Sequence, residues 1–234
     1  MSDNSNYFTK ENLDGYLRAL AKEFRKVNGT SMPAEIILIG GAAILINYGF
    51  RDMTTDVDAI VRASSSMKDA INRVGDKYDL PNGWFNTDFM RTASYSDRLA
   101  EFSTYYRTYS NVLKIYTVSA EYLIAMKLRA GRKYKNDLSD IIGILAEHEK
   151  MGRPITLAMI NKAVEDLYGT WDDFSEDARI FIKQAIEKGN YEQVYETVSD
   201  EEKKSKDILV SFTEDYPGVA NEANVNDILD KLKH

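Results

Sequence analysis

Hydrophobic residues recur at helical spacing through the first part of the chain. The pattern predicts a helix whose apolar face consists of Leu13, Tyr16, Leu17, Leu20, Phe24 and Val27. Thr9 is placed to cap this helix, and Asn28 followed by Gly29 is expected to end it. The chain is therefore expected to begin with an amphipathic helix.

Short apolar runs follow the first helix. The β-branched run at 35–39 predicts a buried strand that continues directly into Gly40 and Gly41. A short helix is expected over 42–48 and a second strand over 54–61. A strand, a helix and a strand at this spacing predict a sheet with a helical crossover.

Helical and extended patterns then divide the rest of the chain. Serines at 64–66 can cap a helix with the apolar face Met67, Ala70, Ile71, Val74 and Tyr78. The segment 84–118 is predicted to be mostly strand, most clearly at 111–118. Beyond Ser119 helices are predicted over 120–130, 137–149, 155–168, 175–188, 191–213 and 225–233. The predicted fold is α/β (α+β), with a small mixed-sheet core and its N-terminal helix over 1–119 and an all-helical region over 120–234.

Composition narrows the functional classes. The 234 residues carry a net charge of −7, which makes wide, nonspecific binding of duplex DNA unexpected. No cysteine is present and only two histidines occur, so a metal would have to be held by oxygen. No signal peptide is visible, and no apolar stretch approaches the ~18 residues of a membrane span. We expect a cytoplasmic protein without membrane partners.

Two aspartates lie one residue apart at the start of the second predicted strand. On a strand Asp56 and Asp58 would share one face, with Cα atoms about 6.5–7 Å apart, while Val57 and Ala59 enter the core. Neighbouring carboxylates repel each other unless a cation lies between them, and Mg²⁺ or Mn²⁺ prefers such oxygens. The alternative is a polar turn over 54–56 that merely precedes the strand.

The glycine pair upstream adds a second element of the same chemistry. Gly40 and Gly41 would let the backbone approach a phosphate at the start of a helix, where free amides attract anions. The alternative is a tight turn. A phosphate cradle beside paired carboxylates is the arrangement of metal-assisted nucleotidyl transfer.

A basic segment followed by two aspartates lies further along the chain. Lys127 stands in an otherwise apolar helix, where it would either reach a β- or γ-phosphate or extend to water. Asp137 and Asp140 lie one helical turn apart, and the alternative for them is an N-cap and a favourable first-turn charge. The local positive charge would help to hold a nucleotide or an RNA end.

These segments resemble the nucleotidyltransferase-fold superfamily. The two blocks that carry the resemblance are "LIGGAAILINYGFRDMTTDVDAIV" and "LIAMKLRAGRKYKNDLSDI". They are most similar to the bacterial branch of abortive-infection and toxin–antitoxin nucleotidyltransferase toxins. The resemblance implies a short mixed sheet flanked by helices, with an added helical part.

The resemblance also implies roles for individual residues. It implies that Asp56 and Asp58 bind the catalytic metal, Mg²⁺ or Mn²⁺. The catalytic residues that it implies are Asp56, Asp58, Lys127 and Asp137. The nucleotide-binding residues that it implies are Gly40, Gly41, Arg51, Thr55, Lys127, Arg132 and Asp140.

The chain departs from the family pattern in two places. The segment "GRKYKNDLSD" is longer than the usual spacing, so several basic residues compete for one position. Many superfamily enzymes have a third carboxylate, for which the candidates in this chain are Asp88, Glu101 or neither.

We expect transfer of a nucleoside monophosphate from a nucleoside triphosphate to a hydroxyl of RNA, such as a tRNA end, or of a protein. The protein would act as a toxin with an antitoxin protein as partner. The alternatives are a non-catalytic nucleotide- or partner-binding module and an interaction protein built on the helical half.

Overall fold

The computed structural model describes residues 7–221 and 224–232. The described residues form two compact units that divide between Leu123 and Ile124. The predicted last residue of the final helix, 233, and the histidine at position 234 lie outside the described residues.

The N-terminal helix of the first unit is α1 (Lys10–Asn28). A reciprocal capping box fixes its start, because the Asn12 N–H donates to Thr9 Oγ1 and the Thr9 N–H donates to Asn12 Oδ1. The predicted helix, its cap and its end are confirmed. Val27 was predicted on the apolar face but is 58% exposed, since the buried face ends at Phe24.

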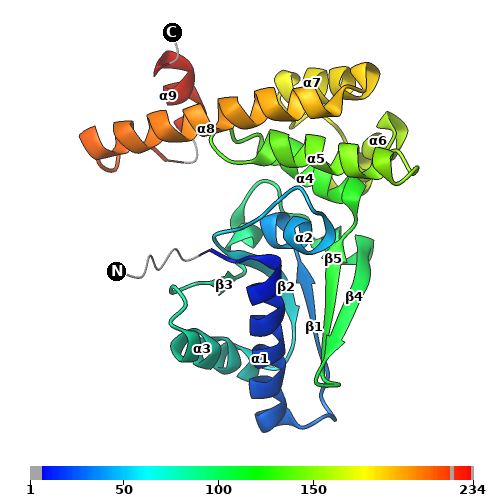
Figure 1. The fold of residues 1–234 in the computed structure, drawn as a ribbon, viewed down its shortest axis with the longest axis vertical. Helices are drawn as coiled ribbons and strands as arrows, with labels where there is room; N and C mark the ends of the chain where they lie inside the picture. Colours follow the sequence, from blue (N-terminus) through cyan, green and yellow to red (C-terminus); the bar gives the residue numbers. More distant parts are fainter. Residues whose placement is uncertain (1–6, 222–223, 233–234) are drawn as a thin grey trace. The chain divides into compact units, whose positions relative to one another are not determined.

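A five-stranded mixed sheet forms the core of this unit, in the order β3-β2-β1-β5-β4 (Figure 1). β1 is antiparallel to β2 and parallel to β5, while β4 is antiparallel to β5 and β3 is parallel to β2. The strands are β1 (Ala34–Leu38), β2 (Val57–Arg62), β3 (Phe85–Asn86), β4 (Ser103–Tyr109) and β5 (Leu113–Val118). The predicted fold class is confirmed.

Three details predicted for the strands and their connections are wrong. β2 begins at Val57, so Asp56 precedes the strand instead of lying on it. The helix α2 (Gly40–Asn47) joins adjacent strands that run antiparallel, so it is not a crossover between parallel strands. Much of 84–118 is not extended, because 3₁₀ turns at Asp88–Arg91 and Asp97–Phe102 interrupt it. These turns bury single residues among polar neighbours, so strand alternation is missing there.

The register of the sheet separates its two faces. Ile36 pairs with Val61 and with Ile115, and these residues share a face with Val57 and Ala59 by alternation. Tyr109 lies at the same face of β4, where its hydroxyl donates to Asp14 of α1 at 2.5 Å. α1 also packs on α3 (Ser66–Tyr78) (Figure 1). The face opposite to α1 is therefore the one on which Asp58 lies.

The second unit is helical. α4 (Ala120–Ala130) continues into it, and the six predicted helices after Ser119 are confirmed to within two residues. The helices that follow are α5 (Asp137–Lys150), α6 (Leu157–Tyr168), α7 (Glu176–Lys188), α8 (Tyr191–Asp215) and α9 (Val225–Leu232). α5 packs along α8, and α8 packs against α9. Among the helices described, none is both long and apolar enough to cross a membrane.

Candidate active site

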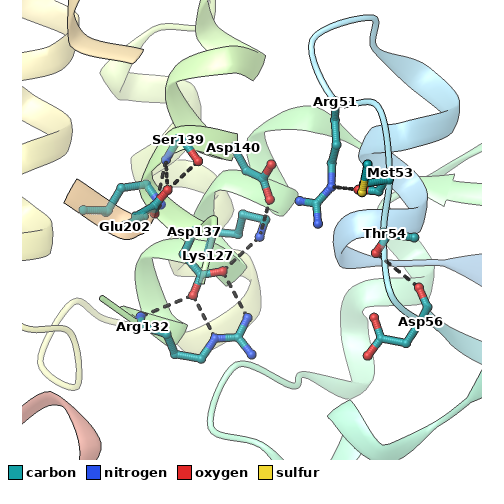
Figure 2. Close-up of polar contacts among 11 residues, drawn as sticks. Arg51, Met53, Thr54, Asp56, Lys127, Arg132, Asp137, Ser139, Asp140 and Glu202 are labelled. Atoms are coloured by element: carbon teal, nitrogen blue, oxygen red, sulfur yellow. Dashed lines mark hydrogen bonds and ion pairs between the residues drawn. The ribbon is translucent and has the colours of Figure 1, made fainter. Parts of the chain in front are cut away.

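The predicted site residues fall into two groups, one in each unit, and Figure 2 shows polar contacts from each. The predicted residues of the first unit are Gly40, Gly41, Arg51, Thr55, Asp56 and Asp58; together with Thr54, which the structure adds, they are called the glycine–aspartate site. The charge cluster belongs to the second unit and consists of Lys127, Arg132, Asp137 and Asp140.

The end of β1 brings Gly40 beside Asp58. The Ile39 N–H donates to the Asp58 carbonyl at 3.0 Å, which ties the residue before α2 to β2. Gly40 has φ +52, a left-handed conformation that favours glycine. A Cβ at this position would lie 3.7 Å from Asp58 Oδ2. The first glycine thus places bare backbone next to a carboxylate.

Gly41 has a steric reason to be glycine. A Cβ there would lie 2.5 Å from Thr54 Oγ1 and 2.9 Å from Arg51 Nη2. Thr54 is buried and its hydroxyl donates to the Asp56 carbonyl at 3.3 Å, while Arg51 Nε donates to the Met53 carbonyl at 2.9 Å (Figure 2). The segment from Arg51 to Asp56 therefore folds directly onto the start of α2.

The two aspartates remain outside the core. Val57 between them is fully buried, whereas Asp56 is exposed and Asp58 is half-buried. In the described part of the chain no group of three His, Cys, Asp or Glu side chains is arranged to hold a metal ion. Two carboxylates still fit Mg²⁺, because that ion usually keeps several waters and takes one or two carboxylates together with substrate phosphates.

Neither candidate for a third carboxylate lies on a strand. Asp88 is exposed in a 3₁₀ turn, and Glu101 is exposed and forms an ion pair with Arg98 at 3.4 Å. Thr55, for which the resemblance implies nucleotide binding, is exposed, and its role stays a prediction. The hydroxyl that lies at Gly41 belongs to Thr54, which sequence reasoning had treated only as part of a polar turn.

Lys127 is the centre of the charge cluster. It is only 8% exposed, and its Nζ lies 2.9 Å from Asp137 Oδ1 and 2.8 Å from Asp140 Oδ2 (Figure 2). The alternative in which Lys127 extends to water is therefore wrong. The N-cap alternative for Asp137 is wrong as well, because Asp137 is the first residue of α5 and its carboxylate is turned to Lys127, while Asn136 is the N-cap.

Arg132 completes the pairing of Asp137. Its Nε donates to Asp137 Oδ2 at 2.9 Å, its Nη2 to Oδ1 at 3.0 Å and its backbone N–H to Oδ2 at 3.2 Å. Burial raises the pKa of Asp137, but Lys127 and Arg132 together outweigh it and hold that pKa well below its usual range. Lys133 pairs with Asp230 instead, which leaves Arg132 as the basic residue of this segment that contacts Asp137.

Sequence reasoning missed two residues that lie next to this cluster, Glu202 and Ser139. Glu202 of α8 is 4% exposed and accepts hydrogen bonds from the Leu138 N–H at 2.7 Å and from Ser139 Oγ at 2.5 Å. Burial raises the pKa of Glu202 to about 7, and Asp137 adds to this rise, although the hydrogen bonds from Leu138 and Ser139 oppose it. The available signal was the helical spacing of Glu202 with Val198, both of which are buried.

The mixed sheet, the glycine pair at a helix start and the aspartates that follow define a protein of the nucleotidyltransferase superfamily, as the sequence predicted. The chain belongs to the family described as nucleotidyltransferase of unknown function (DUF6036), which matches residues 15–179. No curated protein and no solved structure matches the chain significantly. The family match includes both groups of site residues and ends within α7, so α8 and α9 lie outside it.

Proposed function

We propose that the protein is a Mg²⁺- or Mn²⁺-dependent nucleotidyltransferase that moves a nucleoside monophosphate from a nucleoside triphosphate to an acceptor hydroxyl. Family membership supports the class of reaction. The observation that carries the proposal is the approach of Asp58 Oδ2 to the backbone of Gly40 at the start of α2. A carboxylate and the amides of a helix start are the two kinds of group that a metal–triphosphate complex needs.

The residues divide the chemistry among them. Asp56 and Asp58 would hold the divalent ion, which when bound supplies charge neutralisation for the α-phosphate and the leaving pyrophosphate. The amides of Gly40 and Gly41 would bind the β- and γ-phosphates. The acceptor oxygen forms a bond to the α-phosphorus, the bond between this phosphorus and the bridging oxygen breaks, and pyrophosphate leaves. Further nucleotide-binding roles are proposed for Arg51, Thr55, Lys127, Arg132 and Asp140.

A carboxylate would take the proton of the acceptor hydroxyl. The two carboxylates considered for this role are Asp58 and Asp137, both of which the resemblance implies to be catalytic. Lys127 and Arg132 hold the pKa of Asp137 well below its usual range, which makes Asp137 a weak base. We therefore assign this role to Asp58. The role that we assign to Asp137 is to hold Lys127 and Arg132 in place through its ion pairs with them.

The acceptor is proposed to be RNA, such as a tRNA end, or a protein side chain, and the protein is proposed to act as a toxin with an antitoxin partner. The resemblance to toxin nucleotidyltransferases supports this proposal. A second candidate is a module that binds nucleotide without turnover. It is favoured by the fact that the described residues supply only the aspartate pair and no third metal-binding side chain.

The test is transfer of label from each of the four nucleoside triphosphates, α-labelled, to total RNA or total protein in the presence of Mg²⁺. We expect one or more nucleotides to label an acceptor, and Asp58→Asn to abolish the labelling. Asp76→Asn is the matched control, because it removes the same charge from an exposed position on α3.

The outcomes separate the two candidates. Bound nucleotide without transfer from any of the four would favour the binding module. Transfer that survives in Asp58→Asn would contradict the assignment of the metal site to the aspartate pair.

A further inference from the structure

The N-terminal turn of α5 is held by a residue from a distant part of the chain. Glu202 Oε1 accepts the N–H of Leu138 at 2.7 Å, and both carboxylate oxygens lie 3.4 Å from the N–H of Ser139. Ser139 Oγ donates to Glu202 Oε2 at 2.5 Å (Figure 2). The N-cap of α5, Asn136, makes no side-chain hydrogen bond to the helix. Glu202 thus takes over the capping that the local sequence does not provide.

The same turn carries the two aspartates of the charge cluster. Asp137 and Asp140 lie on either side of the residues that Glu202 binds, and both are almost completely buried. Their carboxylates meet Lys127 from one side of the turn, while Glu202 binds its backbone. A displacement of this turn would therefore move both aspartates together.

We propose that Glu202 is a positioning residue of the transfer reaction: as a carboxylate, it holds the first turn of α5 and thereby fixes Asp137 and Asp140 in the arrangement that transfer requires. This inference rests on the proposed function. It assigns a role to α8, which lies outside the part of the chain that the family covers. The ionised form is the effective one, because it accepts from all three donors with charge-assisted hydrogen bonds, whereas a protonated carboxyl is neutral and must donate at one of its oxygens.

Glu202 lines a cavity of about 660 Å³ in the helical unit. Charged groups line it from every element around Glu202. The cations are Arg129, Arg132 and Lys133. The anions besides Glu202 are Asp173, Asp177, Glu201, Asp227 and Asp230, and Asp137 adds a further negative charge from α5. Burial opposes the ionisation of Glu202 most strongly and the negative charge of Asp137 adds to this, in agreement with a pKa raised to about 7.

The sign of the pH effect follows from this arrangement. Above pH 7 Glu202 is ionised and the turn is held. Below pH 7 it takes up a proton, so one carboxyl oxygen becomes a donor, the hydrogen bonds to the backbone lose their charge assistance and the turn loosens. Transfer should therefore fall on the acidic side of pH 7, whereas a residue with a merely structural role would give no such profile.

The experiment compares kcat for transfer between pH 5.5 and 8.5 in the wild-type chain, Glu202→Gln and Glu201→Gln. Glu201 is the matched control, since it is the adjacent acidic residue, is exposed and lines the same cavity. We expect an acidic limb with its midpoint near pH 7 in the wild type and in Glu201→Gln. In Glu202→Gln we expect a flat profile, with kcat at pH 8 reduced about 10- to 100-fold.

Hydrogen exchange of the peptide that covers 137–142 supplies a readout that does not depend on activity. Glu202→Gln and Ser139→Ala should both speed its exchange, and Ser139→Ala serves if Glu202→Gln does not fold. Asp56→Asn should abolish transfer and leave this exchange unchanged. An acidic limb that persists in Glu202→Gln, or unchanged exchange in both variants, would overturn the proposal. Absence of transfer in the wild type, with faster exchange in the variants, would refute the proposed function alone.

Discussion

Replacement of Gly41 by alanine tests the geometry of the glycine–aspartate site directly. The added methyl group would lie 2.5 Å from Thr54 Oγ1 and 2.9 Å from Arg51 Nη2, whereas ordinary van der Waals contact begins at 3.4 Å. Arg51 can withdraw because its head is at the end of a flexible side chain. Thr54 cannot do so at low cost, because it is buried and its hydroxyl is bonded to the Asp56 carbonyl. The segment that carries the aspartates must therefore shift.

Two effects of opposite sign decide the magnitude. Overpacking of a buried contact costs about 1–3 kcal/mol. Alanine in a helix gains about 0.5–1 kcal/mol over glycine. We expect a net loss of about 1–2 kcal/mol in the free energy of unfolding. Gly15→Ala is the matched control, because Gly15 lies inside α1 with nothing within 4 Å of its Cβ position, so only the helical gain should appear.

Urea denaturation of four chains measures this effect: the wild type, Gly41→Ala, Thr54→Ala and the double variant. Because Thr54→Ala removes the contacting oxygen, the cost of Gly41→Ala should shrink in its presence, with a coupling energy of about 1 kcal/mol. A Gly41→Ala chain as stable as the wild type, or fully additive effects, would refute the close approach of Thr54 to α2.

The affinity for nucleoside triphosphate should also fall in Gly41→Ala, and an unchanged affinity would count against a phosphate site at the amides of Gly40 and Gly41.

Three further predictions concern the charged residues. Asp56→Asn and Asp58→Asn should each lose Mn²⁺ binding in calorimetric titration while the fold persists, and the metal-free variants should be slightly more stable because the repulsion is relieved; undiminished binding would exclude these ligands. Lys127→Ala leaves two buried carboxylates without their shared cation, so it should lower the free energy of unfolding by about 3–5 kcal/mol and weaken triphosphate binding. The exposed Lys135→Ala should do neither, and an unaltered dissociation constant in Lys127→Ala would leave that lysine a structural role only. Burial disfavours ionised Glu202 by more than the hydrogen bonds to α5 favour it, which raises its pKa from 4.5 to about 7; its contribution to the stability of the whole fold is therefore fully present below pH 4.5 and is lost as the pH rises through 7, even though the ionised form makes the stronger hydrogen bonds to the turn. The wild type should therefore lose about 3 kcal/mol relative to Glu202→Gln between pH 4.5 and 8, and parallel stability curves would contradict the raised pKa.

Sequence reasoning predicted the helices well because their signals are local. The capping box at Thr9 and the apolar spacing of α1 lie within one element, and the same is true of the caps at Thr156 and Ser175. The segment 87–102 offered no such signal. Phe89 and Leu99 are buried singly in 3₁₀ turns, and isolated apolar residues of this kind resemble a weak strand when only the sequence is read.

The candidate site was predictable to the extent that it depends on spacing along the chain. The glycine pair and the aspartate pair each occupy a few consecutive residues, and their order suggested that they belong together. The place of Thr54 was not predictable, because its contact with Gly41 arises only when the chain from Arg51 folds back over α2. For the same reason the sequence could not decide which of the two threonines, Thr54 or Thr55, lies against the glycine.

The sequence named the residues of the charge cluster, but their burial and mutual pairing lay beyond sequence reasoning for a different physical reason. A charged residue on a helix is expected to face water, and burial reverses that expectation only when opposite charges meet. Lys127 and Arg132 offset Asp137 and Asp140, and this balance keeps Asp137 ionised in a buried place. Glu202 contacts the same turn although it lies 63 residues further along the chain, and it adds a carboxylate to a cluster of two cations and two aspartates. One carboxylate is thus held ionised and the pKa of a neighbouring one is raised to about 7, so the environment drives their pKa values apart in the way that often marks functional sites.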